Sequence, residues 1–288
     1  MKNRITLLIL CFTAIAAIAG MAQTADIEVR YEYTRPSLSG GSYKDKMTLL
    51  ANSAGSKYFN DISLWTDSLE STPEGKAKLD EIIRANCLVQ SPEGYEYWDL
   101  TKGPVKNIYT YVFNNNSDNT LTIYDQWGDE LRFYTEPSDE MQWTLLPDST
   151  NVILGYDCNL AESYYHGRHW KAWFAPEIPL CFGPWKLHGL PGLILKAEAD
   201  GGFSFHATGL QHSDRIMSPM YSAEEYKKTD RRKAQADNEY FINNQEAILK
   251  AQNGGMAKIT YSDDDGNEIA APVYEAAKHS LEPDYKTK

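Results

Sequence analysis

The sequence predicts a mainly β protein with some α-helix: a single curved antiparallel sheet or open half-barrel, with a few helices packed on one side. Three observations predict this fold class. Apolar and polar residues alternate along many short segments, which is the period of a half-buried strand. Short polar turns join these segments, as in antiparallel hairpins. The chain also holds 19 tyrosines and 7 tryptophans, which favour pleated, half-buried surfaces.

The first part of the chain predicts strands followed by one helix. Between residues 67 and 87, apolar residues recur at helical spacing, and Pro73 and Gly75 restrict the helix to the second half of this segment. The strands expected before it are 27–34, 47–51 and 57–60.

The middle of the chain predicts a meander of strands. Residues 162–175 continue it, with Trp170, Ala172 and Phe174 on one face of the strand. The clearest hairpin comes next, with its turn at Asp200-Gly201-Gly202. The other strands expected here are 108–113, 120–124, 131–135, 143–146, 152–156, 193–199 and 203–208.

The last part of the chain is more polar. Residues 222–252 carry sparse apolar anchors in a charged background, which predicts one or two exposed helices. Residues 256–261 and 268–274 predict a final hairpin around Asp265-Gly266. Because no internal repeat or long linker interrupts the pattern, we expect one β-rich domain over residues 23–288.

Residues 1–22 have the composition of a secretory signal peptide. Lys2 and Arg4 precede an apolar run over residues 5–18, and Gly20-Met21-Ala22 places small residues before a cleavage point. The apolar run is shorter than the roughly 20 residues that span a bilayer. We therefore expect cleavage near Ala22 and a periplasmic or secreted location. We also expect that the protein is not an integral membrane protein.

The charge of the chain restricts its function. It has 28 basic and 40 acidic residues and a formal net charge of −12, whereas nucleic-acid binding needs a basic surface. The sequence contains no Gly-x-Ser-x-Gly or His-Glu-x-x-His motif and no phosphate-binding glycine loop. We therefore expect no catalytic residue, no cofactor and a non-enzymatic role.

Residues 175–192 form a segment that no ordinary hairpin requires. Four prolines and three glycines restrict its backbone, and its apolar residues predict a loop held against the sheet. The segment is either a binding surface or a structural plug. Read as a surface, it makes an apolar small molecule or an outer-membrane transport component the expected partner. The candidate ligand-binding residues are Trp170, Trp173, Trp185 and Leu190.

Arg168 opens an aromatic strand and needs a partner if it is buried. We expect a bidentate pair with Glu177 that holds the loop against the strand. The alternative is a solvated arginine at the start of the strand.

Several sequence blocks carry a family resemblance. Gly189-Leu190-Pro191-Gly192-Leu193-Ile194 resembles the signature of the GLPGLI family, also called the Porphyromonas-type family of exported Bacteroidetes proteins. Asp67-Ser68-Leu69 also resembles an O-glycosylation acceptor, as does Asp148-Ser149-Thr150. The other similar blocks are Gly167-Arg168, Ala172-Trp173-Phe174, Pro176-Glu177-Ile178-Pro179, Gly183-Pro184-Trp185-Lys186 and Tyr226-Lys227-Lys228-Thr229.

The resemblance implies a location in a Gram-negative cell envelope and structural roles for Gly189, Pro191 and Gly192, but no established activity. His188 stands where members often carry a small residue or cysteine. Cys158 and Cys181 flank the same strand segment, so we expect them to form a disulfide that leaves Cys87 free, and three free thiols is the alternative. If the family cysteine pairs with the equivalent of Cys158, the resemblance implies that its partner here is Cys181. A second reading of the function is a periplasmic metal-binding protein that uses Cys181 and His188.

Overall fold

The computed structural model describes residues 23–286, apart from 93, 95, 129, 139–140, 219, 253–260 and 263–267. The expected signal peptide and the expected Asp265-Gly266 turn therefore lie outside the described residues. Twelve strands form one large sheet. From one edge to the other they are β10 (Thr144–Ile153), β11 (Tyr156–Tyr165), β12 (Arg168–Ala175), β13 (Leu193–Ala199), β14 (Phe203–His212), β2 (Ile27–Pro36), β3 (Ser42–Ala51), β4 (Gly55–Phe59), β7 (Tyr111–Asn115), β8 (Thr120–Trp127), β9 (Glu130–Pro137) and β16 (Lys227–Lys228).

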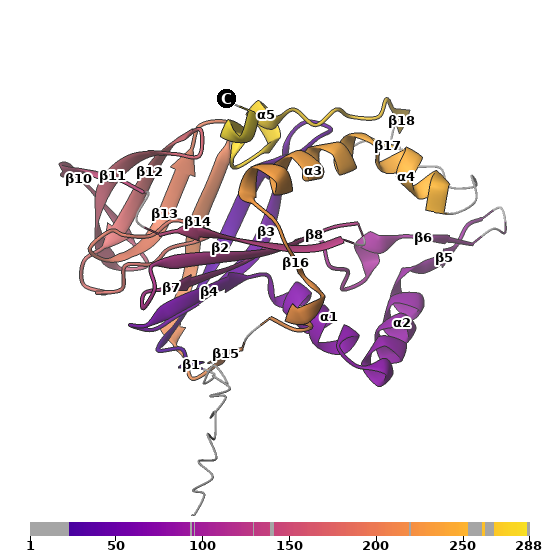
Figure 1. Cartoon of the computed structure of the whole chain (residues 1–288), viewed down its shortest axis with the longest axis horizontal. Coiled ribbons are helices and arrows are strands. Elements are labelled where there is room, and N and C mark those ends of the chain that lie inside the picture. The colour runs from indigo at the N-terminus through magenta and orange to yellow at the C-terminus, as the bar shows by residue number, and fades with distance from the viewer. Residues whose placement is uncertain are drawn as a thin grey trace, which may run out of the picture.

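The large sheet is open and mixed. Its other neighbouring strands pair antiparallel, but β16 runs parallel to β9, with Lys227 opposite Arg132. The expectation of a single antiparallel sheet is therefore wrong at this edge. Strands β12–β14 and β7–β9 run in clearly different directions in Figure 1, so the sheet bends across β2, β3 and β4.

Two apolar clusters lie on opposite faces of this sheet. Leu49 and Leu50 are neighbours in β3, and because successive side chains alternate, Leu49 belongs to the larger cluster and Leu50 to the smaller one. We call these the first and second faces. Trp170, Ala172 and Phe174 are all buried on the first face, as the alternation in this strand predicts.

The helices cover both faces, so the expectation of helices on one side is wrong. Ala234 of α3 packs on the first face and Leu64 of α1 on the second. Figure 1 shows α3, α4 and α5 along one side of the sheet, with α1 and α2 on the other. The helices are α1 (Asp61–Glu70), α2 (Pro73–Cys87), α3 (Arg231–Asn243), α4 (Gln245–Gln252) and α5 (Ala276–His279), with short 3-10 turns at Leu100–Lys102, Ala223–Glu225 and Pro283–Lys286.

Two helices replace the single one expected between residues 67 and 87. The side chain of Asn60 caps α1 by accepting from the Ser63 amide, and Thr72 caps α2 in the same way through Gly75. Pro73 begins α2 instead of excluding it, because the first helical turn needs no donor from proline.

Two hairpin turns were not expected. Leu154-Gly155 joins β10 to β11 and His166-Gly167 joins β11 to β12, each with positive φ at both residues. Such two-residue turns match the twist of antiparallel strands. The break expected between the strands 143–146 and 152–156 is instead a bulge within β10, and the expected strand 162–175 is divided at His166.

Three two-stranded sheets complete the described part of the chain. They are β1 (Gln23–Thr24) with β15 (Ile216–Met217), β5 (Leu88–Gln90) with β6 (Glu96–Trp98), and β17 (Tyr261–Ser262) with β18 (Glu268–Ile269). The last pair agrees with the expected final hairpin as far as that hairpin is described. None of the described helices has the length and apolar character needed to cross a bilayer.

Candidate functional site

The 175–192 loop is fixed across the first face by its own backbone. The Ile194 amide donates to the Phe182 carbonyl at 3.0 Å, and the Gly189 amide donates to the Cys181 carbonyl at 2.8 Å. At Gly192 a Cβ would fall 2.3 Å from the Ala175 carbonyl oxygen, so only glycine fits this close approach. The loop is therefore an ordered part of the core.

Trp185 is the most unusual residue of this loop. Its φ is +54°, a left-handed conformation that costs a bulky residue roughly 1–3 kcal/mol and persists only where the surroundings enforce it. Its ring stacks on Trp170 at 5.6 Å, and Trp170 stacks on Phe205 of β14 at 6.1 Å. This conformation places the indole of Trp185 in the wall of a cavity.

The cavity has a volume of about 240 Å³ and lies on the first face of the sheet. Its wall combines the sheet, the loop, α3 and the segment 274–282 that contains α5. Small-ligand sites are typically concave and mostly apolar, with a few fixed polar groups. The aromatic residues that line the cavity are Tyr33, Tyr58, Tyr109, Trp127, Tyr134, Trp185, Phe205 and Tyr274.

Three polar side-chain atoms in this wall are buried without a hydrogen-bond partner in the structure. They are the Tyr58 hydroxyl, the Trp127 indole nitrogen and the Asn238 amide oxygen. Tyr58 is 3% exposed and Asn238 is 7% exposed, so their unmet hydrogen bonds carry a real desolvation cost. These three polar atoms belong to residues of the cavity wall and are themselves covered by neighbouring protein atoms.

Asp125 adds a carboxyl to the same wall. It follows Leu121 and Ile123 on the inward side of β8 and is 6% exposed. The Thr110 hydroxyl donates to it at 3.2 Å and the Gln126 amide at 2.9 Å. Burial raises the pKa of Asp125 to about 7, although both hydrogen bonds and the more distant Lys106 oppose that rise.

A buried ion cluster borders the cavity. Lys186 is 1% exposed, and its ammonium contacts Glu136 at 2.5 Å and also Glu282. Arg231 of α3 contacts Glu136 at 3.1 Å and Glu282 at 3.5 Å. Burial alone would lower the pKa of Lys186, but the two carboxylates outweigh it and hold that pKa above its usual value. The cluster joins β9, the loop, α3 and the segment after α5.

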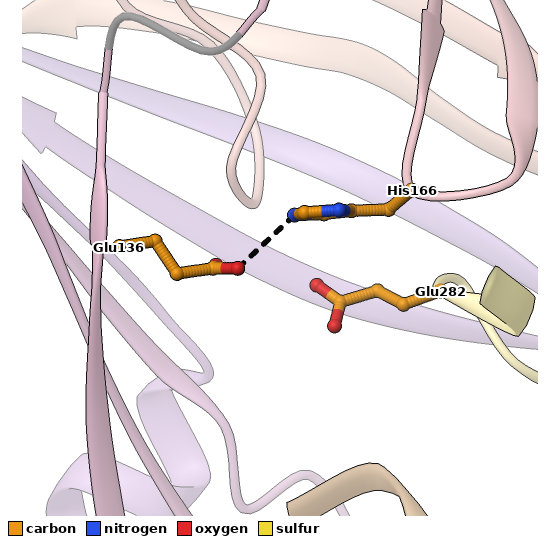
Figure 2. A group of neighbouring side chains, drawn as sticks. All are labelled: Glu136, His166 and Glu282. Carbon is orange, nitrogen blue, oxygen red and sulfur yellow. Dashed lines mark ion pairs between the residues drawn. The ribbon is translucent and has the colours of Figure 1, made fainter. Parts of the chain in front are cut away.

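Part of this cluster resembles a metal site. Glu136, His166 and Glu282 each offer a ligand atom, and these atoms lie within 4.8 Å of one another. Figure 2 shows them converging from a strand, a turn and the segment after α5, with His166 3.2 Å from Glu136. The ammonium of Lys186 already contacts both carboxylates, as does the guanidinium of Arg231. The negative charge is compensated by protein cations, which favours a structural role.

Arg168 is buried, but it does not pair with Glu177. Its guanidinium donates to the Asp200 carbonyl at 3.0 Å, to the Ala277 carbonyl at 2.9 Å and to the Ser280 carbonyl at 2.6 Å. Glu177 is exposed in the turn that follows β12, whereas Arg168 lies at the opposite end of that strand. The expected pair is therefore wrong, and Arg168 fixes the segment that closes the cavity.

The four predicted ligand-binding residues are not gathered at one place. Trp185 lines the cavity, whereas Trp170 and Leu190 are buried behind it in the apolar core. Trp173 is partly buried and packs against the first-face cluster without lining the cavity, and the Lys196 ammonium lies 4.5 Å from its ring centroid.

The cysteines and His188 also have defined places. Cys87, Cys158 and Cys181 are free thiols, so the expected disulfide between Cys158 and Cys181 is not formed. The Cys158 thiol instead lies 3.5 Å from the Tyr156 carbonyl. Both ring nitrogens of His188 contact backbone carbonyls, those of Lys186 at 2.6 Å and of Ser138, which leaves neither nitrogen directed at a metal.

Sequence reasoning missed Asp125, Tyr58 and Asn238. The available signal was an acidic residue at an inward position of an alternating strand, since Asp125 continues the face of Leu121 and Ile123. Tyr58 and Asn238 carried no comparable signal, because their importance depends on elements that meet only in the folded chain.

The chain was compared with curated proteins and with solved structures. The comparison with curated proteins gave no match. Two solved structures are similar to this chain, described as the structure of PNGF-II in the C2 space group and in the P21 space group. They show 15% and 14% sequence identity and TM-scores of 0.47 and 0.49, and they cover 73% and 74% of this chain. The chain spans about a third of their length, 32% and 33%.

One family model also matches. It is described as a protein of unknown function (Porph_ging), and it matches residues 159–196. This range contains most of β11, all of β12, the 175–192 loop and the first part of β13. The loop that forms one wall of the cavity is thus the part of the chain that matches a Porphyromonas-type family of unknown function.

Proposed function

We propose that this protein is a non-enzymatic binding protein of the cell envelope, which takes up a small, mainly apolar ligand in the cavity beside Trp185. In this proposal residues 1–22 direct export, residues 23–288 form one domain of the GLPGLI family, and the bound molecule is the cargo of an envelope process. The single observation that carries the proposal is the aromatic cavity of about 240 Å³.

Two features support ligand binding over a purely structural cavity. Trp185 is held at a positive φ beside the cavity, and strained residues of this kind cluster at binding sites. Tyr58 and Asn238 line the cavity, and each buries a polar atom that has no hydrogen-bond partner among the described residues.

The test uses 2-phenylethanol, a neutral aromatic probe, and titration calorimetry. Ile108 lines the cavity, so Ile108→Trp fills it and should abolish binding of the probe. Ile62 is 42% exposed on α1, so Ile62→Trp is the matched control and should bind as the wild type does. If the wild type shows no binding at millimolar probe, or if Ile108→Trp binds normally, the proposed function is wrong.

A further inference from the structure

We propose that the ligand of this cavity is an organic cation whose protonated amine pairs with Asp125. This inference rests on the proposed function and specifies the chemical class of its ligand. Three sets of observations carry it: the uncompensated carboxyl of Asp125, the ion pairs of the surrounding cations, and the aromatic wall.

Asp125 is a buried acid that lacks a counter-ion. Among the described residues, its side chain forms hydrogen bonds with Thr110 and Gln126 but no ion pair. Burying an ionised carboxylate is costly unless a cation lies close to it. An ammonium group in the cavity would supply that cation and form a charge-assisted hydrogen bond.

The cations around Asp125 are held by other groups. Lys106 contacts Asp67 at 2.6 Å and the Gln126 amide oxygen at 3.2 Å. Arg132, opposite Asp125 in β9, contacts Asp237 at 2.6 Å and also Glu130.

The other charged or titratable residues of the wall also supply no counter-ion to Asp125. Arg35 contacts Asp45 at 2.9 Å, and Glu282 is paired with Lys186 and Arg231. His279 accepts from the amide of Glu275 through its Nδ1. The remaining titratable groups are tyrosine hydroxyls, which are neutral near pH 7. The one acidic group of the cavity without a cation within ion-pair distance is Asp125, among the described residues.

The aromatic wall suits a cation better than a neutral ligand. Aromatic ring faces attract ammonium groups, and the attraction grows when water is excluded. The protein already shows this chemistry on its second face, where the Lys57 ammonium lies between 5.1 and 5.7 Å from the ring centroids of Phe59, Tyr111 and Phe113.

The charge of the whole chain acts in the same direction. Its formal net charge is −12, and an acidic protein concentrates cations near its surface. Because the pKa of Asp125 is about 7, the carboxyl is largely ionised at pH 8 and largely protonated at pH 6. Amine binding should therefore weaken as the pH falls from 8 to 6, whereas binding of a neutral probe should not change.

The experiment compares two probes of the same shape, 2-phenylethylamine, which is protonated at these pH values, and 2-phenylethanol. At pH 8 the wild type should bind the amine about tenfold more tightly, the effect of one charge-assisted hydrogen bond. Asp125→Asn should lose this preference while it still binds 2-phenylethanol, which shows that the cavity is intact. Asp118 is an exposed acid in the β7–β8 turn, so Asp118→Asn is the matched control and should keep the preference.

The outcomes separate the two proposals. Equal binding of both probes by the wild type, or an amine preference that persists in Asp125→Asn, would overturn the cationic ligand and leave the proposed function standing. Failure of both probes to bind would overturn both proposals.

Discussion

Each face of the large sheet buries a lysine completely, and both ammonium groups lie near aromatic rings, but only one of them is paired with carboxylates. Lys186 on the first face contacts two carboxylates, whereas Lys57 on the second face contacts the Ser218 carbonyl at 3.1 Å and three aromatic rings. The pKa of Lys186 is raised, but burial, and secondarily Arg215, lowers the pKa of Lys57 to about 8. Burial is equal in the two cases, so the neighbouring groups decide whether the ammonium stabilises the fold.

The largest effect is expected at Lys186. Lys186→Met leaves two buried carboxylates with Arg231 as their main remaining cation, and should lower the free energy of unfolding by about 3–5 kcal/mol. Urea unfolding followed by tryptophan fluorescence measures this loss. If Lys186→Met lowers the free energy of unfolding by less than about 1 kcal/mol, the claim that Lys186 stabilises the fold and Lys57 does not is wrong.

The dependence of the free energy of unfolding on acidic pH tests the ion cluster of Lys186, Glu136 and Glu282. Although burial acts to raise the pKa of Glu136, Lys186 and His166 lower it to about 2, against an unfolded value of 4.5. Between pH 4.5 and 2 the unfolded state binds more protons, so stability should fall as the pH falls through this window. Glu136→Gln should flatten that fall in urea titrations at stepwise pH. A slope unchanged by the substitution would contradict the assignment.

Arg168 extends the comparison to a buried cation that is held mainly by backbone carbonyls, with the exposed carboxylate of Asp200 at 3.6 Å. Arg168→Lys cannot reach the Asp200, Ala277 and Ser280 carbonyls together, so we expect a loss of about 2 kcal/mol. Limited proteolysis should show faster cleavage near residues 276–286. Lys171→Arg, at a half-exposed ion pair with Glu162, is the control and should change neither readout.

The smallest effect, of opposite sign, is expected at Lys57. Lys57→Met keeps the contact with the rings and removes the buried charge, so stability at pH 7 should rise by about 1–2 kcal/mol. In the wild type, stability should rise between pH 8 and 10.5, because the unfolded chain retains a proton that the folded state has released. Lys57→Met should lack this rise. Destabilisation at pH 7 would show that the ammonium is needed where it lies.

Much of the sheet was predictable because its strands obey local rules. The alternation along residues 27–34 predicts β2, and the Asp200-Gly201-Gly202 turn predicts the hairpin of β13 and β14. The turns at Leu154-Gly155 and His166-Gly167 were missed because neither is the Asn-Gly or Asp-Gly pair that usually marks a two-residue hairpin turn. The order of the strands could not be predicted from the sequence, because no local pattern places β2 between β3 and β14.

The candidate site was less predictable than the sheet. The prolines and glycines of residues 175–192 identified the loop, and with it Trp185. The opposite wall of the cavity comes from α3 and the segment 274–282, far along the chain. Arg168 was expected to need a partner if it is buried, but its closest partners are backbone carbonyls, which every residue carries and no sequence pattern marks.

The central place of β2 bears on how the chain acquires its structure. One edge of this strand pairs with β3, which follows it directly in the chain, and the other edge pairs with the distant β14. The Tyr31 hydroxyl of β2 also donates to the carbonyl of Ile194, 163 positions later. Until that distant half of the chain is present, an aromatic strand presents an open row of hydrogen-bonding groups. Long-range closure of this kind slows folding and exposes the intermediate to aggregation, so a chaperone that shields β2 would speed recovery of the native protein.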